Sequence, residues 1–260
     1  MTGPDPDGAL ADARDALGAA ERIFVLTGAG ISAESGVPTF RGADGLWKNH
    51  RPEELATPLA FRRDPRLVWE WYAWRRGLVS ACEPNVGHRA LASLARERPG
   101  VRIVTQNVDG LHTLAARGAG GPDATLPLEL HGSLFRVRCT ECSHREEHRE
   151  EIDVASTETL PRCDGCRALL RPDVVWFGES LDPAVLDEAA ETARSADLAL
   201  VVGTSAVVEP AASLPRLTAS AGGTLIEVNP DETPLSSRTH IALRGRAGSI
   251  LPRLVESAGV

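Results

Sequence analysis

Four cysteines in the middle of the chain have the spacing of a metal site. They form two C-x-x-C pairs, Cys139 with Cys142 and Cys163 with Cys166, and 20 residues separate the pairs. Four thiolates make a closed tetrahedral zinc site with no open coordination position. We therefore expect one structural Zn²⁺ per chain. The alternative is a redox-active cysteine pair, which the C-x-x-C motif also permits.

A glycine-rich turn near the N-terminus has the residues to bind a dinucleotide phosphate. Gly28, Gly30 and Ala33 fit the G-x-G-x-x-G/A spacing and follow the apolar run Ile23–Leu26, a predicted buried strand. Glycine has no Cβ, so the backbone can lie against a pyrophosphate, and free N–H groups at the start of a following helix would face the anion. An ordinary tight turn is the alternative for so short a motif.

The segment after this turn departs from the usual dinucleotide fingerprint. That fingerprint continues with a full helix, a second strand and an acidic residue about 20 positions on. Here Gly36 and Pro38 should end the helix after about two turns. The stretch from 38 to 47 contains proline, glycines and Arg41 and is typical of a loop, which we predict to cover the ligand.

Other strand patterns also end in polar residues. Strands are predicted at 101–105, 128–130, 198–202 and 224–228. The residues that follow them are Gln106, Asn107, Val108 and Asp109; His131 and Gly132; Gly203, Thr204 and Ser205; and Asn229, Pro230 and Asp231. Strands alternate with helices, which predicts a Rossmann-like α/β fold with a mostly parallel sheet. Ligands bind at the carboxyl edge of such sheets, so these clusters should converge with the turn at 28–33.

The length of 260 residues allows one large α/β domain with insertions. We expect residues 1–48, 84–133 and 172–260 to form the Rossmann-like domain. Residues 49–83 would be a helical insertion, in which Asp64 caps a helix that begins at Pro65. Residues 134–171 would form the smaller four-cysteine zinc-binding module.

Composition narrows the class of protein. The net charge of −8 argues against broad nucleic-acid binding through phosphate contacts. No apolar run approaches the ~20 residues that span a membrane. The first ten residues contain no basic side chain and no apolar core of a signal peptide. The expectation is a cytoplasmic protein, and the absence of a large apolar stripe predicts a monomer.

The combined pattern resembles the sirtuin family of NAD-dependent protein lysine deacylases. The motifs that carry the resemblance are Gly28-Ala29-Gly30-Ile31-Ser32, Gly36-Val37-Pro38-Thr39-Phe40-Arg41, Thr105-Gln106-Asn107-Val108-Asp109, His131-Gly132, the four cysteines, Gly203-Thr204-Ser205 and Asn229. They occur in the family's order from about residue 21 to 250, which is nearly the whole chain, and the combination is highly specific.

The resemblance implies that NAD is bound and consumed as a co-substrate. The residues it assigns to NAD are Gly28, Ala29, Gly30, Ile31, Ala33, Phe40, Arg41, Trp47, Gln106, Asn107, Val108, Asp109, Gly203, Thr204, Ser205, Asn229, Pro230, Asp231 and Ala247. The pyrophosphate would lie on the turn at 28–33 and near Thr204. Asn229 would bind the adenosine ribose, and the nicotinamide end would lie near Asn107.

The chemistry is likewise implied by the resemblance. The acyl-lysine carbonyl oxygen attacks C1′ of the nicotinamide ribose, and nicotinamide leaves. His131 then acts as general base on a ribose hydroxyl, and Asn107 is the second catalytic residue. The products are lysine, nicotinamide and 2′-O-acyl-ADP-ribose. Taken alone, a histidine such as His131 is more often structural, but its unperturbed pKa of ~6.5 suits a base at pH 7.

Tyr72 and Arg75 suggest which acyl group is removed. Tyr72 is the only tyrosine in the chain, and residues three apart share a helix face. A phenol beside a guanidinium can bind a carboxylate. The Tyr-x-x-Arg pattern resembles the sirtuin subclass that removes succinyl, malonyl and glutaryl groups. The alternative is an aromatic core face with a solvated arginine.

The stretch Val175, Trp176, Phe177 and Gly178 would form a β-like edge on which the backbone of an acyl-lysine protein substrate docks. Two other enzyme functions fit the same scaffold, general protein deacetylation and mono-ADP-ribosyl transfer. A non-enzymatic NAD- or zinc-dependent binding module is a third alternative, and the presence of His131 and Asn107 argues against it.

Overall fold

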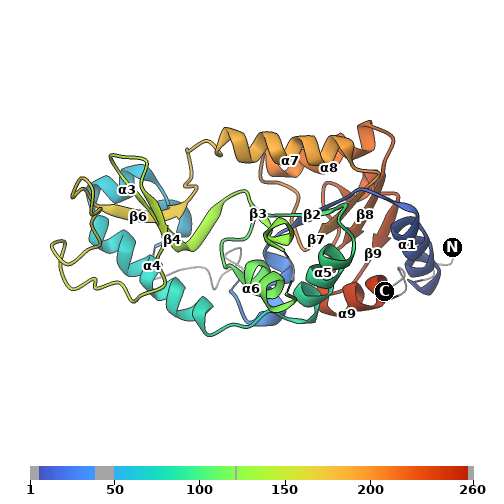
Figure 1. Ribbon diagram of the computed structural model, residues 1–260, viewed down its shortest axis with the longest axis horizontal. Coiled ribbons are helices and arrows are strands. Elements are labelled where there is room, and N and C mark those ends of the chain that lie inside the picture. Colours follow the sequence, from blue (N-terminus) through green and yellow to red (C-terminus); the bar gives the residue numbers. More distant parts are fainter. Residues whose placement is uncertain (1–5, 39–49, 121, 257–260) are drawn as a thin grey trace.

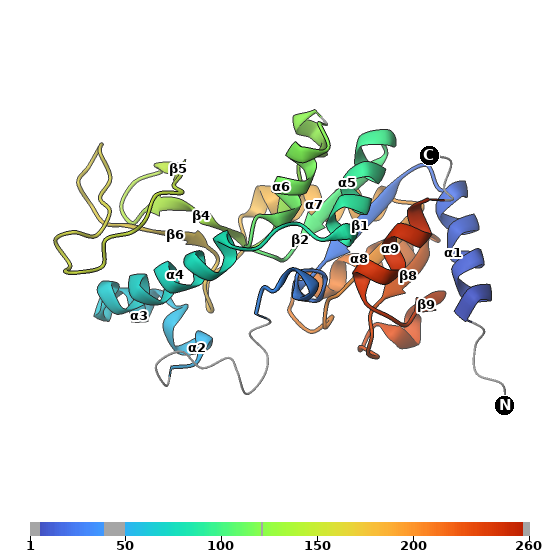
Figure 2. The same ribbon diagram turned by 90° about the horizontal axis from the view of Figure 1, so that it is seen from below.

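The computed structural model describes residues 6–38, 50–120 and 122–256. The molecule is elongated, with a large sheet and its helices at one end and a small sheet with α3 and α4 at the other (Figure 1). The second view, turned by 90°, shows the same division (Figure 2).

Six strands form the large sheet within the described residues. They are β1 (Ile23–Thr27), β2 (Val101–Thr105), β3 (Leu128–Glu129), β7 (Leu198–Val202), β8 (Thr224–Val228) and β9 (Ile241–Leu243). Their order is β3-β2-β1-β7-β8-β9, and every neighbouring pair is parallel. This confirms the predicted α/β fold. The chain builds outward from β1 first on one side and then on the other, so a topological switch point lies at β1, where such sheets bind ligands.

Helices cover both faces of this sheet. One face carries α7 (Pro183–Ser195) and α8 (Leu214–Ser220), and the other carries α1 (Pro6–Ala19), α5 (Val86–Glu97) and α9 (Ala247–Val255), with α6 (Leu111–Gly118) packed on α5. Short 3₁₀ turns occur at Asp123–Thr125, Ala211–Ser213 and Ser236–Arg238. Strand side chains alternate between the faces, so Val25 joins the core under α1, α5 and α9, while Phe24 joins the core under α7. Burial on both faces explains the continuous apolar runs.

The smaller sheet is antiparallel and directly follows β3. It consists of β4 (Gly132–Cys139), β5 (Arg145–Glu147) and β6 (Leu170–Val174), in the order β5-β4-β6. Against it pack α2 (Pro52–Leu55), α3 (Pro58–Arg63) and α4 (Pro65–Ser80). The Asp64 side chain accepts a hydrogen bond from Leu67 N at 2.9 Å, which is the predicted cap of α4.

The helical segment and the four-cysteine segment share one apolar core. Trp69 and Tyr72 of α4 belong to the same buried cluster as Val137 of β4 and Leu170 of β6. Residues expected as two separate insertions therefore stabilise each other, since burying one such side chain contributes about 1.5–3 kcal/mol. The division into units at 48, 83, 133 and 171 stays a prediction.

The prediction of an α-helix after Gly30 is wrong. Two 3₁₀ turns, Ala29–Ile31 and Ala33–Ser35, replace it, with i to i+3 hydrogen bonds such as Ser32 N to Ala29 O at 3.1 Å. Gly36 then adopts φ +86°, a left-handed conformation that ends the second turn at the expected place.

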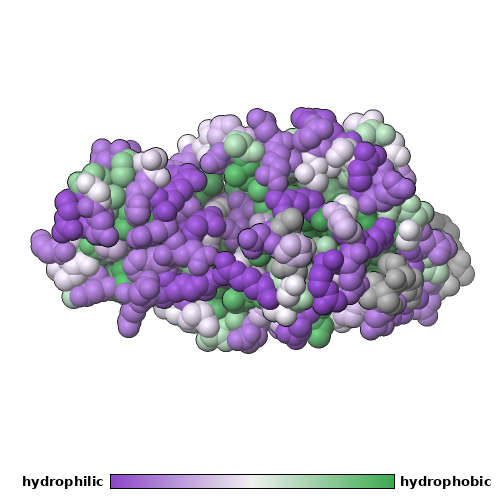
Figure 3. Space-filling view, in the orientation of Figure 1, coloured by the Kyte–Doolittle hydropathy of each residue, from purple (hydrophilic) through white to green (hydrophobic). Residues whose placement is uncertain are grey.

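The face of the molecule seen in Figure 3 is predominantly polar. Hydrophilic residues cover most of the end that carries β4, β6 and α3 in the view of Figure 3. In the described ranges, no helix is both long and apolar enough to cross a bilayer.

Candidate active site

The polar turns predicted to converge are joined by hydrogen bonds at the carboxyl edge of the large sheet. Asn107 Nδ2 donates to Gly28 O at 3.1 Å, which links the turns after β2 and β1. Gln106 Nε2 donates to Thr204 Oγ1 at 3.0 Å, and Asn229 Nδ2 donates to Thr204 O at 2.8 Å. The loops after β1, β2, β7 and β8 therefore form one continuous site.

The glycines of the first turn have a role that the motif did not predict. A Cβ on Gly28 would lie 2.8 Å from Thr204 Cα, and one on Gly30 would lie 2.7 Å from Gly203 O. Their N–H groups are not free for an anion, because Gly28 N donates to Val202 O at 3.0 Å and Gly30 N to Gly203 O at 2.7 Å. These glycines let the loops after β1 and β7 touch at the switch point. The expectation that the N–H groups of Gly28 and Gly30 face a phosphate is therefore wrong.

His131 lies between β3 and β4 and is only partly exposed. Its Nδ1 lies 2.9 Å from Gln106 O. A carbonyl oxygen can only accept, so Nδ1 carries the hydrogen and Nε2 carries the lone pair. Burial lowers the pKa of His131, and the bond to Gln106 opposes this shift. The imidazole is therefore a neutral base at pH 7.

Asn107 and Asp109 belong to one buried network with Ser32. The Ser32 hydroxyl donates to Asp109 Oδ2 at 2.8 Å and accepts from Asn107 Nδ2 at 3.2 Å. Asp109 Oδ1 accepts from Leu111 N, the first N–H of α6, at 2.9 Å. Burial raises the pKa of Asp109, and its hydrogen bonds oppose the shift. The amide of Asn107 is thus held in one orientation.

Two buried histidines extend this network, and sequence reasoning did not single them out. His88 Nε2 lies 3.3 Å from Ser32 Oγ, and His112 Nε2 lies 2.9 Å from Thr27 Oγ1. Their ring centroids are 4.7 Å apart. Burial lowers the pKa of His88 to about 4 and that of His112 well below its usual value. A detectable signal was the spacing of His88 three and four residues before Leu91 and Ala92, on the apolar face of α5.

Tyr72 and Arg75 share a face of α4, as predicted, and both are buried. The Arg75 guanidinium carbon lies 5.5 Å from the Tyr72 ring centroid and 4.7 Å from that of Trp71. Burial lowers the pKa of Arg75, while Tyr72 and then Asp109 favour its charged form. Arg75 is therefore a buried cation, not the solvated arginine of the alternative, and it lies within electrostatic reach of Asp109.

The proposed docking edge is partly engaged within the chain. Val175 N donates to His131 O at 3.0 Å, and Phe177 N donates to Ala56 O at 2.9 Å. Trp176 is buried, whereas Phe177 is 55% exposed. The carbonyl of Trp176 also accepts from Glu179 N at 2.9 Å, so a docked peptide would use the carbonyl oxygens of Val175 and Phe177 and the backbone of Gly178.

The four cysteine sulfurs form a cluster at one end of β4 and β6. Cys139 Sγ lies 3.4 Å from Cys166 Sγ, Cys142 Sγ lies 3.7 Å from Cys163 Sγ, and all four lie within 4.8 Å of one another. A tetrahedral zinc with Zn–S bonds of about 2.3 Å would place its sulfurs about 3.8 Å apart. Hydrogen bonds, first that of the Glu141 N–H and then those within the cysteine cluster, lower the pKa of Cys139 to about 6. The donor set fits one structural zinc ion.

The other predicted NAD residues lie around the same edge. Ala29, Ala33, Ser205, Pro230 and Asp231 are exposed on its loops; Val108 and Gly203 are partly buried; and Ile31 and Ala247 are buried. Gly248 N, at the start of α9, donates to Glu34 Oε2 at 2.7 Å. The predicted lid residues Phe40, Arg41 and Trp47 fall outside the described residues.

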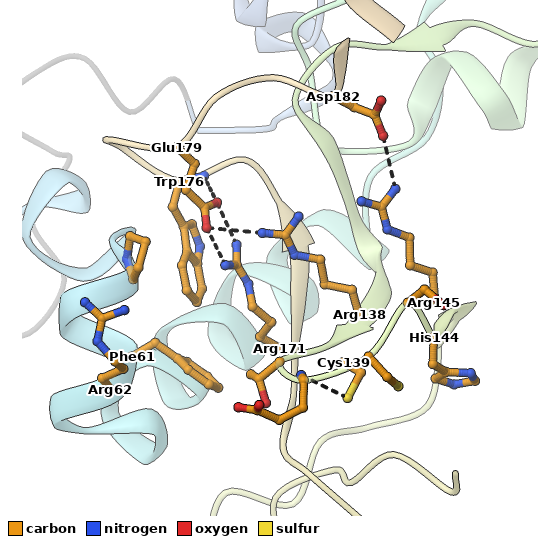
Figure 4. A pocket seen from close by; sticks show the side chains of 15 residues that line it. Phe61, Arg62, Arg138, Cys139, His144, Arg145, Arg171, Trp176, Glu179 and Asp182 are labelled. Carbon is orange, nitrogen blue, oxygen red and sulfur yellow. Dashed lines mark hydrogen bonds and ion pairs between the residues drawn. The ribbon is translucent and has the colours of Figure 1, made fainter. Parts of the chain in front are cut away.

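A pocket of about 700 Å³ lies at the other end of the molecule, between α3, the cysteine cluster and Trp176 (Figure 4). Arg138 and Arg171 project into it and meet the carboxylate of Glu179. The sequence did not predict the ion pairs of Glu179 with Arg138 and Arg171, because pairing between residues on different strands leaves no pattern in the local sequence.

Comparison with known proteins identifies the class. The Sir2 family model matches residues 28–210. NAD-dependent protein deacylase 1 of Archaeoglobus fulgidus is 52% identical over 235 residues, covering 90% of this chain and 91% of the relative. NAD-dependent protein deacylase of Pyrococcus furiosus is 49% identical over 251 residues, covering 95% and 97%.

Solved structures of Sir2 proteins have the same fold as this chain. A Sir2 homologue in complex with NAD superposes with a TM-score of 0.87 at 47% identity, covering 95% of this chain and 93% of the other. Sir2Af2 bound to a myristoylated histone peptide has a TM-score of 0.76 at 34% identity, with 97% coverage of both chains. The chain belongs to the Sir2 family. Its class of activity is NAD-dependent protein deacylation, with NAD as co-substrate and one structural zinc.

Proposed function

We propose that this chain removes succinyl and malonyl groups from protein lysines, and acetyl groups more weakly, to give nicotinamide and 2′-O-acyl-ADP-ribose. The observation that carries the proposal is the buried pair Tyr72 and Arg75 on α4. A cation removed from water is stabilised by an anionic partner, and a phenol that is kept neutral can donate a hydrogen bond to it. An acetyl group offers no negative charge to this pair.

The position of the pair supports this specificity. Arg75 interacts electrostatically with Asp109, and Tyr72 accepts a hydrogen bond from Trp176 in the docking stretch. An acyl chain on a lysine docked at 175–178 and directed toward Asn107 would therefore run alongside α4. Asp109 favours the charged form of Arg75, so the guanidinium can offer its charge to the carboxylate of an acyl group.

We infer the roles of the site residues from the same contacts. His131 Nε2 would accept the proton of a ribose hydroxyl, since Nδ1 is engaged with Gln106 O. The fixed amide of Asn107 would bind near the nicotinamide end. The loops at Thr204 and Asn229 would hold the phosphates and the adenosine ribose. Phe40, Arg41 and Trp47 stay predictions.

The partners would be proteins that carry acylated lysines. One relative has been solved with a myristoylated histone peptide, and an acylated peptide is the ligand class we propose here. A cytoplasmic location and a monomeric state remain predictions from the sequence. The division into a Rossmann-like domain, a helical insertion and a zinc module is also a proposal.

The test compares matched acetyl-, malonyl- and succinyl-lysine peptides with NAD, for the wild type and Arg75→Met. We expect the wild type to prefer the anionic acyl groups. The variant should lose at least tenfold in kcat/KM on succinyl-lysine and much less on acetyl-lysine, because a charged hydrogen bond is worth about 1.5–3 kcal/mol. Equal losses on both peptides would refute the carboxylate pocket. ADP-ribosylated protein in the product mass spectrum would favour the transferase alternative.

A further inference from the structure

A hydrogen bond connects Trp176 of the docking stretch to Tyr72, which together with Arg75 forms the proposed acyl pocket. Trp176 Nε1 donates to Tyr72 Oη at 2.8 Å, and both side chains are buried. Tyr72 lies on α4, whereas Trp176 lies just after β6, so this bond joins two segments about 100 positions apart in the chain. The Trp176 indole is therefore positioned to orient the hydroxyl of Tyr72.

The direction of this bond determines what the phenol can do. An indole N–H can only donate, so it occupies a lone pair of the Tyr72 oxygen and leaves the hydroxyl hydrogen to be donated elsewhere. Burial raises the pKa of Tyr72, so the hydroxyl keeps its hydrogen at neutral pH. In the part of the chain that the structure describes, no oxygen accepts this hydrogen. The fully buried donor thus requires an acceptor, and a carboxylate is a strong one.

A second set of contacts fixes the indole in place (Figure 4). The Arg171 guanidinium carbon lies 3.3 Å from the Trp176 ring centroid. The same guanidinium donates to both oxygens of Glu179, at 2.6 and 2.9 Å, and to Val174 O at 2.8 Å. Glu179 Oε2 also accepts from Trp176 N at 2.9 Å. The backbone and the ring of Trp176 are both restrained by this arginine–glutamate pair.

We propose that Trp176 is a positioning residue for acyl selectivity, which holds the Tyr72 hydroxyl as an obligate donor toward the carboxylate of the acyl group. Arg171 and Glu179 hold Trp176 in turn. The pocket then discriminates in two ways: Arg75 supplies charge, and the oriented hydroxyl disfavours acyl ends that cannot accept its hydrogen. This inference rests on the proposed function of the Tyr72 and Arg75 pair.

The variant Trp176→Phe keeps an aromatic ring and removes the N–H. Trp69→Phe is a matched control, because Trp69 is also fully buried in the same cluster and donates its Nε1–H to Leu170 O at 3.0 Å. We expect Trp176→Phe to lower the ratio of kcat/KM for the succinyl-lysine peptide to that for the acetyl-lysine peptide about fivefold, mainly through a higher KM for the succinyl-lysine peptide, which is the effect of one lost hydrogen bond. Trp69→Phe should leave the ratio of the two kcat/KM values unchanged.

A double-mutant cycle with Tyr72→Phe separates orientation from packing. If the indole acts through the hydroxyl, Trp176→Phe should reduce succinyl selectivity no further once Tyr72 is phenylalanine. Equal effects of Trp176→Phe in both backgrounds would overturn the proposal. So would a change in selectivity in Trp69→Phe as large as in Trp176→Phe.

A readout on the wild type does not depend on any variant folding. Tyr72 is the only tyrosine of the chain, so the tyrosine Fermi doublet in the Raman spectrum reports this hydroxyl alone. A tyrosine-free succinyl-lysine peptide should change the intensity ratio of the two bands toward that of a donating hydroxyl. The acetyl-lysine peptide should leave the ratio unchanged. The same response to both peptides would contradict the proposal. A wild type without anionic acyl preference would instead refute the proposed function itself.

Discussion

The Nδ1 atom of His131 lies 2.9 Å from the carbonyl oxygen of Gln106, while the side chain of Gln106 donates to Thr204 Oγ1 at 3.0 Å. Gln106 therefore sets the tautomer of the His131 imidazole through its carbonyl, and its side chain links the same turn to the loop after β7. The catalytic nitrogen is Nε2, because Nδ1 carries the hydrogen. This arrangement makes the role of His131 directly testable.

Replacing His131 by asparagine should remove the base without unfolding the chain, because the residue is only partly buried. We expect kcat for deacylation to fall by roughly 10²–10⁴, the usual contribution of general base catalysis. NAD affinity, measured by calorimetry, should change little. His144→Asn, in the partly exposed turn before β5, is the control and should retain activity. Normal turnover by the His131 variant would exclude the assigned role.

The pH profile should carry the signature of a depressed histidine pKa. Burial lowers the pKa of His131, so the base stays neutral and active below the ordinary value of about 6.5. As the pH falls through the lowered pKa, kcat/KM should decline with a slope of one proton. An acid limb centred at or above 6.5 would show that burial does not control this group.

Stability should fall on acidification because of His88 and His112. Both are buried as neutral rings, and the pKa of His88 is lowered to about 4, whereas it returns to about 6.5 on unfolding. Between these values the unfolded chain binds a proton that the folded chain does not, so stability is lost as the pH drops. Each histidine should contribute a slope of about 1.4 kcal/mol per pH unit in this window.

Urea unfolding at a series of pH values measures this slope, and His88→Gln should reduce it. The glutamine amide can still hydrogen-bond Ser32 but has no proton to gain. Asp109 acts in the opposite direction, because its raised pKa favours folding where the carboxyl is protonated. An unchanged slope in the variant between pH 6 and about 4.5 would contradict the assignment.

Asn107→Asp should destabilise the fold as well as reduce activity. The Asn107 amide donates to Gly28 O and Ser32 Oγ, so an aspartate would place an acceptor against the Gly28 carbonyl. We expect a loss of about 1–3 kcal/mol in the free energy of unfolding, the cost of an unsatisfied buried polar group. Chemical denaturation tests this, and a variant as stable as the wild type would show that the amide is not held as described.

Zinc removal should disorganise the small sheet and, through it, the acyl pocket. Cys139 and Cys163 belong to the same buried cluster as Tyr72 and Trp176. Chelation, or Cys139→Ser, should change the near-ultraviolet circular dichroism of the tryptophans and abolish deacylation, while Cys82→Ser should retain one zinc per chain. A metal-free protein with full activity on succinyl-lysine would rule out this coupling.

Local sequence patterns were sufficient for the elements of the large sheet and for the metal site. Apolar runs such as Leu198–Val202 predicted strands because burial on both faces leaves no polar positions. Cys139 and its three partners predicted a cluster because the C-x-x-C spacing alone brings two sulfurs together. The convergence of Asn107, Thr204 and Asn229 followed from the rule that parallel strands share a carboxyl edge.

Contacts between distant segments could be decided only by the tertiary structure. The same glycines that matched a phosphate-binding motif pack against Gly203 and Thr204, and their N–H groups are bonded within the chain. No spacing rule indicated that His88 would reach Ser32, or that Trp176 would donate to Tyr72. The residue types and their order along the chain are local information, whereas the direction of a hydrogen bond depends on how separate elements pack. The sequence by itself therefore determined which loops meet at the sheet edge, and the fold decided which further side chains join them and how each side chain is oriented.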